Sequence, residues 1–146
     1  MIIEPVTYTD ALWDEVKRYA AACSWRAGKS LAQEMQNHAF SDWERVFVLH
    51  ENGNIYGYCT VAKKDCIPDL TYTPYIGYLF VDEKKRGHRM GQKLILAAMD
   101  YLRNVGFHEV YLVSDHENLY EKYGFSVICR AAAPWGAVEK IYHQSL

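Results

Sequence analysis

The chain has 146 residues, of which 50% are hydrophobic, and a formal net charge of −2. This length allows one well-buried core but is short for two ordinary domains, so we expect residues 1–146 to form a single domain. The weakly acidic charge argues against a general nucleic-acid-binding protein, because neutralising several phosphates needs a broad basic surface.

The first predicted elements are a strand and two helices. Residues 2–7 form a strand-like run, and Thr9 is placed to cap a helix whose apolar residues recur at three-to-four spacing between positions 12 and 23. Ser30 and Gln33 form a capping-box pattern, which predicts the start of a second, weaker helix.

A β-hairpin and a central strand follow. Residues 45–50 and 55–64 are rich in Val, Tyr, Phe and Thr, and Asn52-Gly53 between them is typical of a tight hairpin turn. After a loop at 65–74, residues 75–81 form an almost continuous apolar and aromatic run, which is typical of a strand covered on both faces. We expect this strand in the middle of the sheet.

The second half of the chain predicts alternating helices and strands. Residues 91–104 have an apolar helical pattern that Gly106 ends. The remaining elements are a buried strand at 109–113, a short helix at 117–123 and closing strands at 125–130 and 138–143. We therefore expect an α+β fold: a mixed, mostly antiparallel sheet of six or seven strands, flanked by about four helices, with a parallel pair in the middle.

A basic segment lies between the central strand and the helix at 91–104. Residues 84–93 hold five Lys and Arg residues and His88, but no acid. A chain entering a helix here points unpaired backbone N–H groups and a positive dipole end at one spot, and Gly87 and Gly91 leave room for a bulky anion such as a pyrophosphate. The segment has neither a GxGxxG pattern nor a P-loop. A solvated charged loop is the alternative interpretation.

Two motifs resemble those of the GNAT acetyltransferase superfamily. The segment Val81-Asp-Glu-Lys-Lys-Arg-Gly-His-Arg-Met-Gly91 resembles the family's motif A, Q/R-x-x-G-x-G/A, with Arg86 and Gly91 at its outer positions. Arg89 replaces the inner glycine, and an arginine there is able to contact phosphate itself. Leu119-Tyr-Glu-Lys-Tyr-Gly-Phe125 resembles the family's second motif, F-Y-x-K-x-G-F. The resemblance implies the GNAT fold and an acetyl-CoA-dependent N-acetyltransferase.

The resemblance also implies how the cosubstrate binds. The pantetheine arm of acetyl-CoA lies between strands 75–81 and 109–113, and an amine attacks the thioester directly, without a metal or a covalent enzyme intermediate. Backbone N–H groups near Leu79 to Val81 would pair with the pantetheine and stabilise the oxyanion that develops. The expected cofactor-binding residues are Leu79, Phe80, Val81, Arg86, Gly87, His88, Arg89, Met90, Gly91, Gln92 and Asn118.

Tyr120 occupies the position of the family's general acid. A phenol with an ordinary pKa near 10 stays protonated at pH 7 and is able to donate its proton to the departing thiolate. The alternative is an amphipathic tyrosine that packs the short helix against the sheet. The general base stays open, because residues 75–81 contain no acid. Asp115 is a candidate helix cap, and His116 is a candidate base.

The acetyl acceptor is expected to be a small-molecule amine. Trp25, Tyr72, Tyr75 and Trp135 are candidates for an aromatic pocket, while no dense acidic patch in the sequence argues for a polyamine or an aminoglycoside. A homodimer through the closing strands is compatible with the sequence, which contains nothing that requires it.

Two functions from other classes stay open. One is a catalytically silent module of the same fold that binds acyl-CoA as a sensor or a partner domain. The other is a small interaction protein whose basic loop contacts an acidic partner or RNA, with strongly salt-dependent binding.

The sequence lacks a signal-peptide pattern and any apolar run of the roughly 18 residues that a membrane helix requires. Its four cysteines do not have C-x-x-C spacing, so we expect reduced thiols and no metal site. We expect a cytoplasmic protein with no nucleic-acid or membrane partner.

Overall fold

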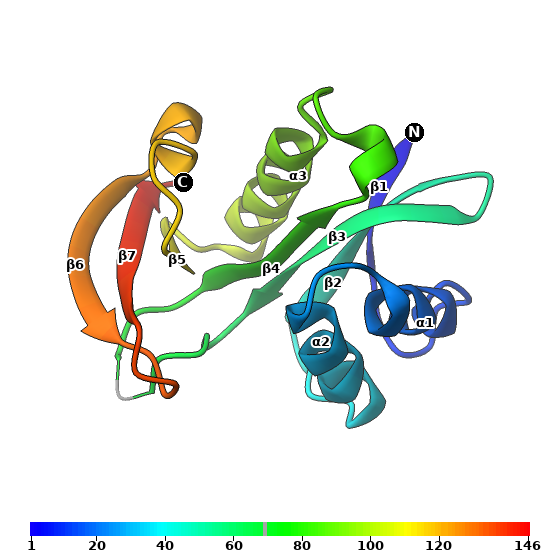
Figure 1. Ribbon diagram of the computed structural model, residues 1–146, viewed down its shortest axis with the longest axis horizontal. Coiled ribbons are helices and arrows are strands. Elements are labelled where there is room, and N and C mark those ends of the chain that lie inside the picture. Colours follow the sequence, from blue (N-terminus) through cyan, green and yellow to red (C-terminus); the bar gives the residue numbers. More distant parts are fainter. Residues whose placement is uncertain (69) are drawn as a thin grey trace.

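The computed structural model describes residues 1–68 and 70–146. One sheet of seven strands, in the order β1-β2-β3-β4-β5-β7-β6, runs through the molecule (Figure 1). The elements are β1 (Ile2–Val6), α1 (Trp13–Ala22), α2 (Ala27–Gln36), β2 (Arg45–Glu51), β3 (Asn54–Ala62), β4 (Tyr75–Val81), the 3₁₀ turn η1 (Glu83–Lys85), α3 (Met90–Val105), β5 (Glu109–Ser114), the 3₁₀ turn η2 (Tyr120–Tyr123), β6 (Ser126–Ala132) and β7 (Val138–Ser145). The predicted mixed α+β architecture is confirmed.

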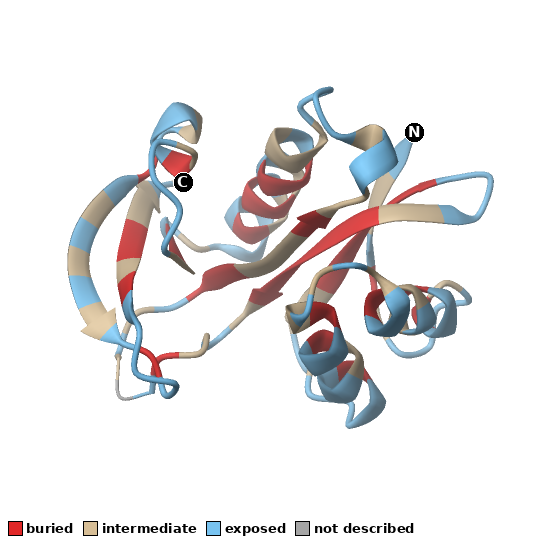
Figure 2. Ribbon diagram, in the orientation of Figure 1, coloured by how far each residue is buried: buried red, intermediate tan, exposed pale blue. Residues whose placement is uncertain are grey.

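The sheet separates two layers of core. Side chains of successive strand residues point to opposite faces, so in β2 Phe47 packs on the α3 side and Val48 on the side of α1 and α2. Figure 2 shows the buried stripes of the three helices turned toward the sheet. A third, smaller cluster, which includes Tyr75, Tyr111 and Ile141, lies where β4, β5 and β7 meet.

The central pair of strands separates along its length. β4 and β5 run parallel, as predicted, but Tyr75 and Tyr111 are their one pair of facing residues, and the Tyr111 N–H donates to Pro74 O at 2.9 Å. Beyond this point β4 continues to Val81 without a ladder to β5 among the described residues. The middle of β4 is therefore half-buried, where the apolar run predicted coverage on both faces.

An irregularity in β4 accompanies this separation. Tyr78 has a positive φ of 49°, and the register between β3 and β4 shifts between Tyr58 and Thr60. A bulge of this kind twists a strand away from its neighbour. It turns the C-terminal part of β4 away from β5.

The N-terminal caps predicted for α1 and α2 are wrong. The N-cap of α1 is Leu12 and makes no side-chain cap, and α2 begins at Ala27, so Ser30 lies inside the helix. The chain turns into α2 through backbone bonds, with the Gly28 N–H donating to Trp25 O at 3.0 Å. The N-cap of α2 is Arg26, and the Ser24 hydroxyl, two residues earlier, hydrogen-bonds the carboxylate of Glu83.

The hairpin and α3 form as predicted, but the short helix does not. Asn52 and Gly53 have φ angles of 52° and 82°, and Gly106 ends α3 with a φ of 119°. In place of a helix at 117–123, η2 is a single turn, because Asn118 has a φ of 60°, which an α-helix interior excludes. The N-cap of η2 is Leu119, so Asp115 does not cap it.

None of the helices within residues 1–68 and 70–146 combines the length and apolar character that a membrane span requires. All four cysteines are free thiols. In the same described ranges, no three His, Cys, Asp or Glu side chains come together in a way that would hold a metal ion.

Candidate functional site

The start of α3 offers free backbone donors to an anion. The first bond of the helix is from the Lys93 N–H to Arg89 O at 3.1 Å, so the N–H groups of Met90, Gly91 and Gln92 come before any helical acceptor. The helix has 16 residues and adds the positive end of its dipole at this point. The loop before it contains η1, which Asp82 caps by accepting the Lys84 N–H at 3.0 Å.

A cavity of about 290 Å³ lies against these donors. A Cβ at Gly91 would lie 3.8 Å from Leu79 Cδ2 and 3.9 Å from Val81 Cγ2, which are ordinary contact distances. The glycine therefore leaves open space at this point, and its position does not exclude a small side chain. A phosphate group fits this combination of open space, backbone donors and positive charge. The cavity is lined by Val81, Arg86, Gly87, Arg89, Met90, Gly91 and Tyr123.

The expected cofactor-binding residues that do not line this cavity differ in their placement. Leu79 lies below Gly91, whereas Phe80 points to the opposite face of the sheet, toward α1 and α2. His88 is exposed on the loop, and Asn118 is exposed on the separate loop before η2. Gln92 is half-buried in the first turn of α3.

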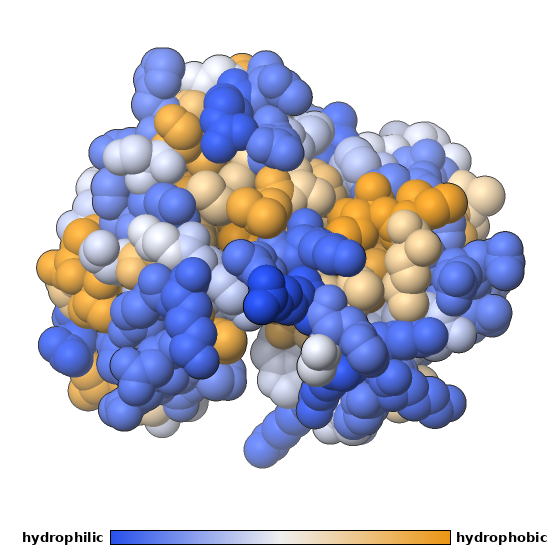
Figure 3. Space-filling model, turned by 90° about the horizontal axis from the view of Figure 1, so that it is seen from above, coloured by the Kyte–Doolittle hydropathy of each residue, from blue (hydrophilic) through white to orange (hydrophobic). Residues whose placement is uncertain are grey.

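Two arginines of the loop are held differently. Arg86 Nε donates to Val81 O at 2.9 Å, and its guanidinium lies 5.5 Å from the centre of the Phe80 ring, so this side chain is fixed by the protein. Arg89 has a φ of 60° and forms no ion pair within the described residues. Its backbone thus adopts the left-handed conformation that glycine favours, while its charge is available to a ligand. Figure 3, the molecule of Figure 1 seen from above, shows hydrophilic surface in the middle of this face and hydrophobic surface beside it.

The separation of β4 and β5 adds a second feature. From Ile76 to Val81 the edge of β4 that faces β5 has no ladder partner in the described part of the chain, while its other edge pairs with β3. Backbone N–H and C=O groups without a ladder partner are free to hydrogen-bond a ligand. An extended chain with amide groups, such as a pantetheine arm, fits an edge of this kind next to the anion site.

Tyr120 is packed inside the protein. It is 6% exposed, and its ring lies 5.5 Å from that of Tyr142 and 6.2 Å from that of His116, between centroids. Burial raises the pKa of the Tyr120 hydroxyl to about 12, against an opposing hydrogen bond from Ser114 at the end of β5. The ring packs in the core on the α3 side of the sheet, and its hydroxyl lies beside Ser114 of β5.

The candidates for a general base are placed as follows. Asp115, His116 and Glu117 are exposed, and His116 Nδ1 lies 2.9 Å from Ser114 Oγ. A carboxylate that the sequence analysis missed lies nearer to β4. Asp65 Oδ2 is 2.8 Å from the position that a Cβ of Gly77 would occupy. No local pattern marks Asp65, because only the folding of the loop 65–74 brings it onto the strand.

Of the four aromatic residues expected in one pocket, Tyr72 and Tyr75 lie together around Tyr111, whereas Trp25 and Trp135 lie elsewhere. The Trp25 ring stacks on Phe80, with centroids 6.1 Å apart, whereas Tyr72 stacks on Tyr111 at 4.7 Å. Trp135 is 64% exposed in the turn between β6 and β7. Position 69, in the loop 65–74, lies outside the described residues.

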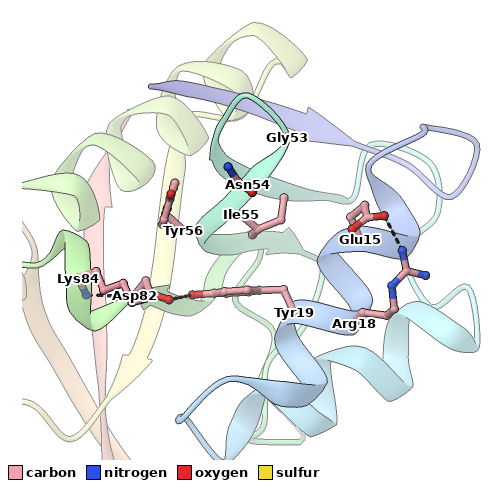
Figure 4. A pocket seen from close by; sticks show the side chains of 9 residues that line it. All are labelled: Glu15, Arg18, Tyr19, Gly53, Asn54, Ile55, Tyr56, Asp82 and Lys84. Carbon is pink, nitrogen blue, oxygen red and sulfur yellow. Dashed lines mark hydrogen bonds and ion pairs between the residues drawn. The ribbon is translucent and has the colours of Figure 1, made fainter.

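A larger cavity of about 580 Å³ lies elsewhere, between α1, the hairpin and η1 (Figure 4). On one side of it the Tyr19 hydroxyl donates to Asp82 Oδ2 at 2.8 Å, and on the other Arg18 pairs with Glu15. It includes neither the free N–H groups of α3 nor the β4–β5 opening. We therefore give it no part in the chemistry.

Comparisons with known proteins bear on these features. Residues 42–127 match the model of the acetyltransferase (GNAT) domain. This range contains the hairpin, β4, the loop 82–89 before α3, and η2. Among curated proteins, none matches this sequence closely enough to carry an argument.

Solved structures share the fold. An aminoglycoside 6'-N-acetyltransferase from Enterococcus faecium superposes with a TM-score of 0.74 at 16% identity, over 99% of this chain and 97% of that one. The protein yncA from Salmonella typhimurium, solved with its cofactor acetyl-CoA, has a TM-score of 0.66 at 19% identity, over 100% and 94%. A ribosomal-protein-alanine N-acetyltransferase from Brucella melitensis has a TM-score of 0.67 at 16% identity, over all of both chains.

Proposed function

Because the chain belongs to the GNAT acetyltransferase family, we propose that it transfers the acetyl group of acetyl-CoA to a primary amine of a small molecule. The observation that carries the proposal is the meeting of two features at one end of β4. These are the cavity at the free N–H groups of α3 and the unpaired edge of β4. The first suits a pyrophosphate and the second a pantetheine arm, and acetyl-CoA contains both.

Acetyl-CoA supplies an activated acetyl group as a thioester. In the transfer, a bond forms between the amine nitrogen and the acetyl carbonyl carbon, and the bond between that carbon and sulfur breaks. The amine loses one proton and the departing sulfur gains one, so the products are an N-acetylated amine and free coenzyme A.

The protein's own groups would serve this transfer in three ways. Met90, Gly91 and Gln92 would bind phosphate through backbone N–H groups, with Arg89 adding charge. The N–H groups of β4 would hold the pantetheine and stabilise the negative charge that develops on the carbonyl oxygen. Tyr120 would donate a proton to the departing sulfur: its hydroxyl is protonated at pH 7, and burial, which raises its pKa to about 12, makes it a weaker acid than an exposed phenol.

The structural neighbours do not identify the acceptor, since identities of 16% to 19% support the fold alone. An aminoglycoside and the alanine of a ribosomal protein, which two neighbours acetylate by name, are both amines. We propose that the enzyme acts in the cytoplasm, where its four free thiols would stay reduced.

The proposal is tested by a thiol-release assay with acetyl-CoA and a panel of small amines. The expected result is coenzyme A release that depends on the amine and equals the amount of N-acetylated product. Tight binding of acetyl-CoA without release for any amine would favour the silent acyl-CoA-binding module. Binding of neither acetyl-CoA nor coenzyme A would contradict the proposal.

A further inference from the structure

Two carboxylates from distant parts of the sequence lie on the face of the sheet opposite α3. Asp65 belongs to the loop after β3, and Glu139 belongs to β7. Glu139 alternates with Ile141, a member of the cluster around Tyr75 and Tyr111, so its side chain is on the same face as these residues. The two carboxylates therefore lie on either side of the place where β4 and β5 separate.

Asp65 lies directly over the central strand. Its Oδ2 is 2.8 Å from the position of a Gly77 Cβ, a position that is also 3.2 Å from Thr60 Oγ1 on the neighbouring strand. Its Oδ1 accepts the Cys66 N–H at 2.6 Å. Any side chain larger than glycine at position 77 would push this carboxylate away.

Glu139 and Tyr75 carry polar atoms without partners. Glu139 is 9% exposed and Tyr75 is 2% exposed, and neither Glu139 Oε2 nor the Tyr75 hydroxyl has a hydrogen-bond partner in the described structure. Burial, and after it nearby charges that include Asp65, raises the pKa of the Tyr75 hydroxyl and of the Glu139 carboxyl, so both groups lie near Asp65. Unpartnered buried groups are costly and indicate a ligand that would satisfy them.

In the described part of the chain, the carboxylates of Asp65 and Glu139 have no ion-pair partner among the Lys, Arg and His residues. Burial, Asp115 and Asp65 raise the pKa of Glu139, and the smaller influence of His116 opposes them. Glu34 of α2 lies beside Tyr78 and is a third acid near Asp65.

We propose that Asp65 and Glu139 bind an acceptor with at least two ammonium groups, such as a diamine or a polyamino sugar. One amino group binds at Asp65, beside the β4 edge at which the acetyl group is delivered, and a second binds at Glu139. The inference rests on the proposed function, because it names the acceptor of the same reaction. It also accounts for the position of Gly77, which leaves room for Asp65 on the strand.

The test uses binding, which needs no turnover. The full chain is titrated by calorimetry with 1,4-diaminobutane, with spermidine, with kanamycin and with butylamine, which has the same carbon chain as the first but a single charge. We expect at least one of the polycations to bind ten or more times as tightly as butylamine. Tighter binding of kanamycin would indicate a polyamino sugar as the acceptor, and tighter binding of 1,4-diaminobutane or spermidine would indicate an aliphatic polyamine.

Variants locate the second charge. Glu139→Gln should remove the preference for the polycation and leave butylamine binding unchanged, and Asp65→Asn should weaken all amines. Glu51→Gln, at the exposed end of β2, is the matched control and should change neither. Equal binding of butylamine and the polycations, or a preference that survives Glu139→Gln, would overturn the proposal. A parallel titration with acetyl-CoA separates the two proposals, because it fails only if the acetyltransferase assignment fails.

Discussion

Replacing Arg89 by glycine should stabilise the protein and weaken its binding of acetyl-CoA. Arg89 has φ and ψ angles of 60° and 26°, in the left-handed region, which costs a residue with a Cβ about 1–2 kcal/mol. Glycine gives back about 0.4–1 kcal/mol through the greater freedom of the unfolded chain, which leaves a net gain of about 0.5–1 kcal/mol. At about 2.1 cal/mol/K per residue, 146 residues have an unfolding entropy of about 0.3 kcal/mol/K, so Tm should rise by about 2–3 °C.

The same substitution removes a guanidinium from the anion cavity. A charge-assisted hydrogen bond to phosphate is worth about 1.5 kcal/mol, so the Kd for acetyl-CoA should rise about tenfold at low salt and less at high salt. Arg89→Ala is the control, because it removes the same side chain and keeps a Cβ in the left-handed conformation. Its Kd should rise equally, but its Tm should not rise. A lower Tm in Arg89→Gly, measured by calorimetry, or an unchanged Kd in both variants would refute this reasoning.

Three further predictions concern the site. Tyr120→Phe should lower kcat by about 10²-fold and leave the Kd for acetyl-CoA unchanged, because it removes a proton donor and little shape; undiminished turnover in thiol-release kinetics would remove Tyr120 from catalysis. Gly91→Glu should abolish acetyl-CoA binding, whereas Gly91→Ala, whose Cβ makes only ordinary contacts, should fold and bind more weakly; equal Kd values for these two variants would argue against the phosphate site. Finally, burial raises the pKa of the Tyr120 hydroxyl from an ordinary value near 10 to about 12 in the folded protein. The free energy of unfolding should therefore fall as pH rises from about 10 to 12, since the unfolded chain loses a proton that the folded chain keeps. Denaturant unfolding of wild type and Tyr120→Phe should show this difference above pH 10 and not below it.

Local chemistry predicted those parts of the fold in which a few neighbouring residues decide the backbone. Asn52-Gly53 requires a tight turn wherever the hairpin lies, and Gly106 ends α3 by a conformation that other residues avoid. The basic segment with Gly91 likewise predicted the cavity at the start of α3, because a strand, a loop and a helix in sequence suffice to build it.

Contacts between distant elements were beyond such reasoning. The apolar run at 75–81 indicates burial but does not reveal that β4 and β5 separate, since that depends on the bulge at Tyr78. Asp65 and Glu139 look like isolated acids in the sequence, which is why no acidic patch was expected. Asp65 reaches the sheet because its loop folds onto β4, and Glu139 lies on the same face because β7 inserts between β5 and β6.

The most direct test of the central claim is a calorimetric titration of acetyl-CoA into the wild-type protein and into Gly91→Glu under the same conditions. We expect the wild type to bind acetyl-CoA at one site per chain and the variant to lose this binding, while the variant keeps the thermal unfolding of a folded protein. Equal binding by the two proteins, or no binding by the wild type, would contradict the claim that the start of α3 holds the acetyl donor.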